Sequence, residues 1–475
     1  MNIISSREKI MKRIFIILAL VSISYVASAG IPDTTTHKWG VMQVPEDYGK
    51  PDGKTIKIYW EKLCSISSDS QAIVMINGGP GCTHDSFHHL NQNGGYEKDW
   101  FDALRSHFDI YYFDQRGTGH SSQLTPALAA QSDLTQYGTE NTCRDMEELR
   151  KTIIKKDKIA VLGESYGGMA ALSYTVMYPD SVSNLIVHDS CPSNDYYVHM
   201  HKNLSDGIEK LDAEVFPGIK VNFQKTLQRI DERAIITSPP TIFDRNTFLN
   251  ACLPLTYNFQ SQEYLAILVK ELAANGQSQI LNNLVAAGYI IPISQVKWDD
   301  PKYASLFTTF LVQALEMLDE KAIGTLAAEQ PCAPYNLEWL DKAILRVRRD
   351  LRKDCALDRF TPYDVTNRLS SIHVPTLMIV GKYDMVTPMK YASVIQKGIG
   401  TSCKMMIVDG AAHGGFIEQS GSVIPAIQNF LLRTESSQKP LFSIQTIIAP
   451  KRVTRTSYPT KEEIIKAYLE GLRRM

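Results

Sequence analysis

Short apolar runs rich in β-branched and aromatic residues recur along the chain, each followed by turn-forming residues. Runs of this length with such boundaries are typical of buried strands. They cover residues 72–76, 108–113, 158–162, 182–189, 375–381 and 404–409. Two earlier segments, 40–45 and 55–60, are separated by a turn-rich stretch and predict an antiparallel pair.

Segments with helical spacing lie between these runs. Residues 141–156 carry Met146, Leu149 and Ile153 on one face, a second helix begins near residue 169, and a third covers 417–432. Strands that alternate with helices predict an α/β fold with a mostly parallel, doubly wound sheet and right-handed crossovers.

The alternation breaks after the sixth predicted strand. A helix-rich block follows, with helical periodicity at 211–230, 264–274, 303–327 and 337–351. A helical block between two sheet strands predicts an inserted cap. The expected organisation is a signal peptide at 1–29, a first core part at 30–189, a helical cap at 190–369, a second core part at 370–435 and a C-terminal extension at 436–475.

The extension ends in a predicted helix. Thr460 and Glu463 have the spacing of a capping box. The apolar residues that follow form one face, which is expected to pack against the body; they are Ile464, Ile465, Tyr468, Leu469 and Leu472.

The N-terminus has the pattern of a secretory signal. Lys12 and Arg13 precede an apolar run at 14–26, and the small residues 27–29 follow. The pattern predicts cleavage after Ala29, export to the periplasm or the medium, and no stable membrane span afterwards. A membrane anchor is the alternative, but the run is short for a span of about 20 residues.

Composition limits the partners. Lys+Arg 50 and Asp+Glu 51 give a net charge of −1 with no basic stripe, so a nucleic-acid partner is not expected. The eight cysteines lie beyond the signal segment, and an even count in an exported chain favours disulfides, whose pairing stays open. Cys82 is expected to form a bridge. No CxxC pair is present, so a zinc site is not expected.

The stretch 163–168, Gly-Glu-Ser-Tyr-Gly-Gly, lies between a predicted strand and a predicted helix. A serine on such a turn, with glycine two residues to either side, is typical of a nucleophile elbow. The glycines allow strand and helix to approach closely, and the turn strains the serine. Ser165 is therefore the candidate nucleophile; a solvated serine in a Gly-rich turn is the alternative.

Asp384 and His413 follow two later predicted strands, at the edge where parallel strands gather functional groups. A serine hydroxyl needs a neutral imidazole to take its proton, and a carboxylate to orient that imidazole. The order Ser165, Asp384, His413 resembles that of the α/β-hydrolase fold. Asp189 and Asp409 are alternatives for the acid.

The glycine-rich stretch 77–81 follows the third predicted strand. Backbone N–H groups without intervening side chains can bind a developing oxyanion, so Gly79 and Tyr166 are the predicted donors. The loop 114–121 contains a GxG but lacks the rest of a dinucleotide fingerprint. We therefore expect this loop to shape the active site and not to bind a dinucleotide. Neither a cofactor nor a metal is expected.

These motifs resemble the proline iminopeptidase and tripeptidyl-aminopeptidase family of serine peptidases. The matching segments are 78–81, 114–121, 163–168, 374–377 and 381–384 with Thr387 and Pro388. The resemblance implies a short peptide substrate, hydrolysis from its free N-terminus, a helical cap and no cofactor.

The chain departs from that family at two positions. Met385 stands where several members have a glutamate that helps bind the substrate's ammonium, and Asn77 stands where others have histidine. A buried ammonium needs a paired carboxylate. The acids that remain as candidates are Glu164, Glu209, Glu214 and Glu263.

Asn77 and Glu164 are also similar to the residues with which serine carboxypeptidases bind a terminal carboxylate, so both are predicted substrate-binding residues. The loop 114–121 and the segment 381–388 favour the aminopeptidase. The sequence thus predicts an exported serine aminopeptidase that acts through an acyl-enzyme. A carboxypeptidase-like exopeptidase or an esterase is the alternative, and a non-catalytic binding protein is a third possibility.

Overall fold

The structure is a computed structural model, and it describes the chain in several ranges. These are residues 37–67, 70–83, 103–191, 196–241, 243–290, 304–316, 352, 357, 360–432, 444–447 and 457–474. The predicted signal segment, the predicted helix at 337–351, and both Cys332 and Cys355 lie outside them.

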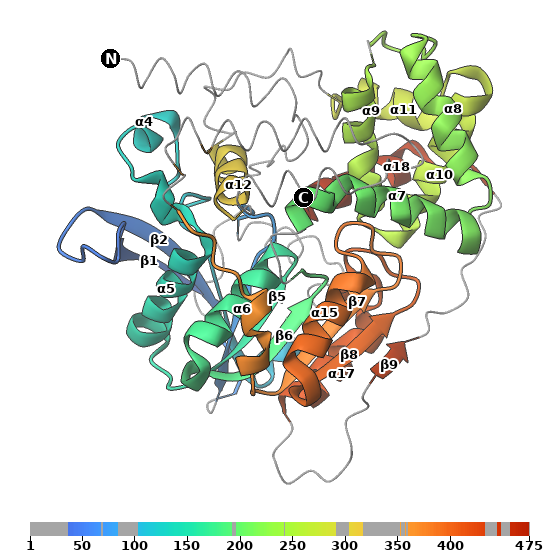
Figure 1. Ribbon diagram of the computed structural model, residues 1–475. Coiled ribbons are helices and arrows are strands. Elements are labelled where there is room, and N and C mark those ends of the chain that lie inside the picture. The colour runs from blue at the N-terminus through green and yellow to red at the C-terminus, as the bar shows by residue number, and fades with distance from the viewer. Residues whose placement is uncertain are drawn as a thin grey trace.

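A nine-stranded sheet forms the centre of the described residues (Figure 1). Its strands are β1 His37–Pro45, β2 Thr55–Leu63, β3 Gln71–Ile76, β4 Phe108–Phe113, β5 Ile159–Glu164, β6 Val182–His188, β7 Thr376–Gly381, β8 Cys403–Val408 and β9 Ile444–Ile447. The order across the sheet is β1-β2-β4-β3-β5-β6-β7-β8-β9. β2 is antiparallel to both β1 and β4, and all other neighbours are parallel.

Helices cover both faces of this sheet, as the alternating pattern predicts. All described helices, including those that lie away from the sheet, are in chain order α4 Pro126–Ala129, η1 Leu134–Tyr137, α5 Thr139–Leu149, η2 Arg150–Ile154, α6 Tyr166–Met177, η3 Pro179–Ser181, α7 Tyr196–Glu214, α8 Ile219–Asp231, α9 Arg245–Cys252, η4 Leu253–Thr256, α10 Phe259–Asn275, α11 Gln279–Ala286, α12 Ala304–Leu315, η8 Thr366–Ser371, α15 Met389–Ile399, η9 Gly400–Ser402, α16 Gly415–Glu418, α17 Ser420–Leu431 and α18 Lys461–Arg474.

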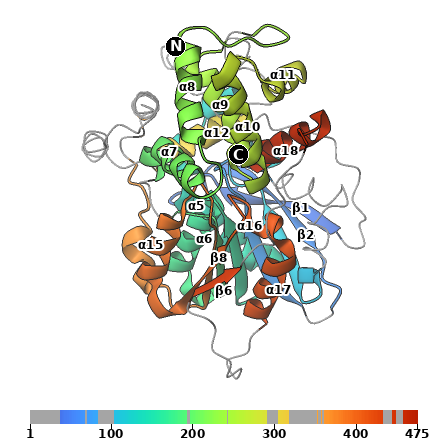
Figure 2. The same cartoon turned by 90° about the vertical axis from the view of Figure 1, so that its right-hand side faces the viewer.

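Alternation along the strands divides the core between the two faces. Val74 packs in a cluster with Leu172 of α6 and Ile395 of α15, whereas its neighbour Ile73 packs in a second cluster with Ile427 of α17. Figure 2 shows α6 and α15 on one side of the sheet and α17 on the other. The predicted mostly parallel, doubly wound fold is confirmed.

The described helices α7 to α12 form an insertion between β6 and β7, and Figure 1 shows α7, α8, α10 and α11 beyond one edge of the sheet. Their apolar residues, such as Phe223, Leu268 and Leu281, belong to a third hydrophobic cluster, which extends to Tyr383 in the loop after β7. The insertion is bonded to loops that follow strands: Gln262 Nε2 donates to Tyr383 O at 3.0 Å, and Lys210 Nζ donates to Lys382 O at 2.7 Å. The insertion therefore adjoins the carboxyl ends of the parallel strands; the domain boundaries stay a prediction.

One predicted helix is wrong in its extent. The periodicity at 211–230 predicts a single helix, but α7 ends at Glu214 and α8 begins at Ile219. Pro217 cannot donate a backbone hydrogen bond, and Gly218 takes a left-handed conformation with φ 91°. These two residues interrupt the helix although the apolar spacing continues across them.

The C-terminal extension contacts both the sheet and the insertion. β9 joins the sheet beside β8, and α18 packs on the insertion, where Ile464 and Tyr468 are buried. The predicted capping box is confirmed: Glu463 N donates to Thr460 Oγ1 at 3.2 Å, and Thr460 N donates to Glu463 Oε2 at 2.7 Å. Packing against the body is confirmed as well.

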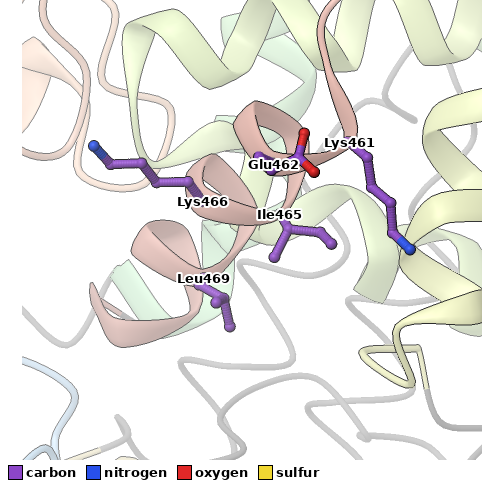
Figure 3. A pocket seen from close by; sticks show the side chains of 5 residues that line it. All are labelled: Lys461, Glu462, Ile465, Lys466 and Leu469. Carbon is purple, nitrogen blue, oxygen red and sulfur yellow. The ribbon is translucent and has the colours of Figure 1, made fainter.

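The predicted apolar face of α18 is divided between two environments. Ile465 and Leu469 line a hollow of about 400 Å³ together with Lys461, Glu462 and Lys466 (Figure 3).

None of the six described cysteines forms a disulfide bond; they are Cys64, Cys82, Cys143, Cys191, Cys252 and Cys403. The expected disulfides are therefore wrong for this part of the chain, and Cys82 forms no bridge. Burial raises the pKa of Cys82 to about 12, and the charge of Glu164 acts in the same direction, so its thiol stays protonated. None of the helices in the described ranges is both long and apolar enough to cross a bilayer.

Candidate active site

Ser165 lies on the turn between β5 and α6, in a conformation that is rare for a residue with a side chain. Its φ is 56° and its ψ is −124°. Two hydrogen bonds fix this turn to the end of β6 and the residues after it. Ser165 N donates to His188 O at 2.9 Å, and Ser190 Oγ donates to Ser165 O at 2.5 Å. A strained serine that the surrounding structure fixes in this way is typical of a functional position.

The glycines around Ser165 are required by close packing. A Cβ on Gly163 would lie 2.1 Å from Gly167 O, and a Cβ on Gly167 would lie 2.1 Å from Ile76 O. A Cβ on Gly78 would lie 2.9 Å from the Cβ of Ser165. The elbow thus packs directly against the end of β3 and the loop that follows it.

Asp384 and His413 meet at the ends of β7 and β8. His413 Nδ1 lies 2.8 Å from Asp384 Oδ2, and both side chains are buried. Asp384 Oδ1 accepts hydrogen bonds from Val386 N at 2.7 Å and Thr387 N at 2.9 Å, which fix the carboxylate. The structure therefore brings together the predicted acid and the predicted base, which are 29 residues apart in the sequence.

The other ring nitrogen of His413, Nε2, is buried and makes no hydrogen bond with the described residues. The Ser165 Oγ to Nε2 hydrogen bond is thus not formed in this structure, and such bonds often close only with substrate bound. Tyr257 packs edge-on against the His413 ring, with centroids 5.2 Å apart.

Charge around His413 favours the imidazolium. Burial alone would lower the pKa of His413, but the charge and hydrogen bond of Asp384 outweigh it, with help from the charges of Asp189 and Glu164. The pKa of His413 is therefore raised above its ordinary value of 6.5. A stronger base suits proton transfer from a hydroxyl.

Asp189, the alternative acid, also lies close to His413. One carboxylate oxygen of Asp189, one of Asp384 and one ring nitrogen of His413 all lie within 4.8 Å of one another. Asp189 accepts from Gly381 N at 2.7 Å and from Gly415 N at 3.2 Å. Asp189 therefore joins the two loops that carry Asp384 and His413, but it is Asp384 that bonds the ring.

The carboxylate of Asp189 is held in its charged form. Its Oδ2 lies 2.8 Å from His188 Nε2. Burial alone would raise the pKa of Asp189. The charge and hydrogen bond of His188, the charge of His413 and the hydrogen bond from Gly381 N outweigh this effect, so the pKa of Asp189 is lowered. Because these donors already use its oxygens, the cluster has the chemistry of an acid–base site rather than of an ion cage.

The predicted oxyanion loop is stabilised by its neighbours. Gly79 has φ 104°, a conformation that favours glycine. Gln115 Nε2 donates to Asn77 O at 3.0 Å. Gln115 belongs to the loop 114–121, which is anchored by the buried bidentate pair of Arg116 with Asp145, at 2.6 and 2.8 Å. That loop has the predicted site-shaping position.

Tyr166, the other predicted oxyanion donor, is the first residue of α6. Backbone N–H groups in a first helical turn have no intrahelical acceptor, so the Tyr166 N–H is available. Its side chain points into the core, where Tyr166 OH lies 2.9 Å from Thr139 Oγ1.

Asn77 and Glu164, the predicted substrate-binding residues, flank the elbow. The Asn77 amide is buried, and neither its Nδ2 nor its Oδ1 has a hydrogen-bond partner among the described residues. A buried amide that lacks a hydrogen-bond partner is energetically costly. Glu164 Oε1 lies 3.8 Å from His188 Nδ1.

Two acids of the insertion are already paired at the surface. Glu209 Oε1 lies 3.0 Å from Lys220 Nζ, and Glu214 Oε2 lies 3.4 Å from Lys382 Nζ. Met385, at the family's glutamate position, is buried against α7, since a Cβ on Gly207 would lie 2.1 Å from Met385 Cγ. An apolar contact with the insertion thus replaces a carboxylate.

Sequence reasoning missed the part played by Thr387. Its Oγ1 lies 2.7 Å from Asp189 O, 2.8 Å from Asp384 Oδ2 and 3.1 Å from His413 Nδ1. This hydroxyl therefore links the Asp384 carboxylate and the His413 ring to the backbone carbonyl of Asp189. Its place in the motif with Pro388 was the only signal in the sequence.

The fold and this arrangement of side chains define an α/β-hydrolase. A family model described as alpha/beta hydrolase fold matches residues 71–420, which is more than half of the chain. The chain therefore belongs to the α/β-hydrolase family, and its curated relatives are hydrolases.

The relatives are proline iminopeptidases. The chain is 24% identical to the proline iminopeptidase of Saccharolobus solfataricus over 397 residues, which are 83% of this chain and 95% of that protein. It is 30% identical to the proline iminopeptidase of Aeromonas sobria over 150 residues, 29% of this chain and 34% of that protein. Among solved structures, the proline iminopeptidase of Mycobacterium smegmatis aligns with a TM-score of 0.43 and 13% identity, covering 82% of this chain and 97% of that one.

Proposed function

We propose that the chain is an exported serine aminopeptidase, similar to the proline iminopeptidases, that hydrolyses N-terminal residues from short peptides. The observation that carries the proposal is the buried His413, which is held at Nδ1 by Asp384 and has no partner at Nε2 among the described residues. Export rests on the N-terminal sequence pattern alone. N-terminal sequencing of the protein from the periplasm or medium tests it, with cleavage after Ala29 expected.

In the proposed reaction, Ser165 Oγ attacks the scissile carbonyl and its proton passes to His413 Nε2. The N–H groups of Gly79 and Tyr166 bind the oxyanion. The imidazolium then protonates the leaving amine as the C–N bond breaks, which leaves an acyl-enzyme. Water, activated by His413, hydrolyses the ester, releases the N-terminal residue as its carboxylic acid and restores the Ser165 hydroxyl.

The test is a comparison of fluorogenic aminoacyl substrates with free and blocked amines, proline included. We expect cleavage only with the free amine, and we expect Ser165→Ala to abolish it because no other group supplies the nucleophile. Equal activity on blocked substrates would refute the aminopeptidase and leave the serine chemistry intact.

A carboxypeptidase-like activity is the second candidate, favoured by the unpartnered amide of Asn77 beside Glu164. A glutamate donates to a carboxylate only when it is protonated, so this activity would release C-terminal residues from amine-blocked dipeptides and would be highest in acid. Cleavage of esters alone would indicate an esterase. Failure of a fluorophosphonate probe to label Ser165 in the folded protein would indicate a binding protein.

A further inference from the structure

Helix α12 of the insertion contacts the loops around Ser165 through hydroxyl groups. Thr309 Oγ1 donates to Pro80 O at 2.5 Å, and Thr308 Oγ1 donates to Gly117 O at 2.8 Å. Both threonines are buried, and the first of these contacts joins residues 229 positions apart. Pro80 lies in the predicted oxyanion loop, directly after Gly79.

We propose that Thr309 is a positioning residue that fixes the oxyanion loop, so that this helix of the insertion takes part in catalysis. The inference rests on the proposed serine chemistry but not on the class of substrate.

The reason lies in the flexibility of the loop. Gly78 and Gly79 have no side chains to restrict their backbone, and an oxyanion donor is effective only when its direction is set before the reaction. The loop is held at one end by Gln115, which donates to Asn77 O. Thr309 holds the other end at Pro80 O, and the fixed φ of proline transmits that restraint toward Gly79.

The end of the same helix is anchored beside the elbow. Glu316, directly after α12, accepts a hydrogen bond from Thr139 N at 2.6 Å, and Thr139 Oγ1 in turn lies 2.9 Å from Tyr166 OH. Arg352 Nη1 donates to Ala314 O at 2.9 Å at the C-terminal end of the helix. The C-terminal end of the helix that carries Thr309 is thus fixed by two other segments, and a positioning group requires such support.

The experiment compares Thr309→Val with Thr226→Val. Valine matches the shape of threonine but lacks its hydroxyl. Thr226 is the control, because its buried Oγ1 also faces backbone carbonyl acceptors, Asn222 O at 2.8 Å and Val269 O at 3.1 Å, within the insertion and away from the oxyanion loop. The readouts are the labelling rate of Ser165 by a fluorophosphonate, kcat and KM on a cleaved substrate, and stability in urea.

We expect Thr309→Val to lower kcat and the labelling rate by about tenfold and to leave KM nearly unchanged, since the oxyanion forms only in the transition state. Thr309→Ser should restore both rates to within about threefold of the wild type, because it keeps the donor. Thr226→Val should lose comparable stability with unchanged labelling. Should Thr309→Val not fold, Thr309→Ala, which adds no methyl group beside Pro80 O, carries the same expectation.

Labelling of Thr309→Val at the wild-type rate would overturn the inference, as would an equal loss of labelling in Thr226→Val. Either result leaves the proposed function standing. A wild-type protein that is not labelled at all refutes the serine chemistry and the positioning role with it. Labelling without aminopeptidase activity refutes only the substrate class.

Discussion

Two carboxylates lie near the His413 ring, and their contacts differ in kind. Asp384 bonds Nδ1 directly, whereas Asp189 accepts hydrogen bonds from Gly381 N, at the end of β7 shortly before Asp384, and from Gly415 N, at the start of α16 shortly after His413. Asp384 can therefore set the tautomer of the imidazole. Asp189 fixes the loops and adds a negative charge that raises the pKa of His413.

Asp189→Asn should shift the pH dependence of the reaction toward acid. The base must be neutral to accept a proton, so kcat/KM should fall as the pH decreases through the pKa of His413, which lies above 6.5. Asparagine keeps an acceptor for Gly381 N but removes the charge, so the imidazolium loses stabilisation and the midpoint moves to lower pH. The measurement is kcat/KM against pH for both proteins.

Asp384→Asn is the comparison for this shift. This variant should lower kcat at every pH, by the order of 10³- to 10⁴-fold, because the amide favours the wrong tautomer of the His413 ring. A midpoint that stays in place in Asp189→Asn would contradict the electrostatic role of Asp189 and leave it only a structural one.

The residues of the candidate triad could be predicted because the chemistry dictates their types and their order along the chain. Ser165 is marked by glycines that close packing requires, and Asp384 and His413 are marked by the strands that they follow. Asp189 ends the predicted strand 182–189 and was an alternative for the acid, but nothing in the sequence marks the contacts that Asp189 and Thr387 make. Their contacts depend on how three loops from different strands approach one another, which local pattern does not contain.

At the scale of elements, α12 ends in a buried acid. Burial raises the pKa of Glu316 to about 7, against which the hydrogen bonds from Thr139 and the charge of Arg352 act only in part. Its Oε2 has no hydrogen-bond partner among the described residues. The folded state therefore favours the protonated carboxyl.

This acid makes stability depend on pH, and the sign follows from the raised pKa. An acid with a folded pKa above its unfolded value contributes stability at low pH, and the contribution is lost as pH rises from 4.5 through about 7. Glu316→Gln keeps the acceptor for Thr139 N and removes the charge. We expect it to be more stable than the wild type at about pH 8, by up to about 3 kcal/mol, and to gain little at about pH 5.

Urea unfolding of both proteins across this pH range measures the difference. Glu462→Gln, which removes an exposed acid from α18, is the control and should leave the pH dependence of stability unchanged. A gain that is the same at every pH would mean that Glu316 is already neutral throughout the range.

The helices and strands could be predicted where one physical requirement, such as burial on both faces of the sheet, determines the residue types. The central parallel strands are buried on both faces, so they form continuous apolar runs, and β4 and β7 match their predicted ranges within a residue. The four-residue strand β9 was not predicted, because an edge strand of that length has no distinctive pattern and depends on its pairing with β8. The break between α7 and α8 was marked by Pro217 and Gly218, and the apolar spacing concealed it.

At the scale of the molecule, the chain returns to the insertion after completing the sheet. Ile464 and Tyr468 of α18 belong to the same buried cluster as Tyr383 and Met385, the residues on either side of Asp384. The insertion, the C-terminal helix and the loop that carries the candidate acid therefore share one core. This link joins segments far apart in the sequence, and the apolar face of α18 could predict only that the helix docks, not where.

Gly471 tests this link, because α18 approaches the insertion closely at this residue. A Cβ at this position would lie 1.9 Å from Pro254 O, so the backbones of α18 and η4 must separate to admit a side chain. We expect Gly471→Val to lower the free energy of unfolding by about 1–3 kcal/mol, measured in urea. Gly421→Ala in α17, where a Cβ meets nothing within 4 Å, should be neutral or stabilising. Equal stability of Gly471→Val and the wild type would mean that α18 is not held against the insertion in solution, and the shared core would then end at η4.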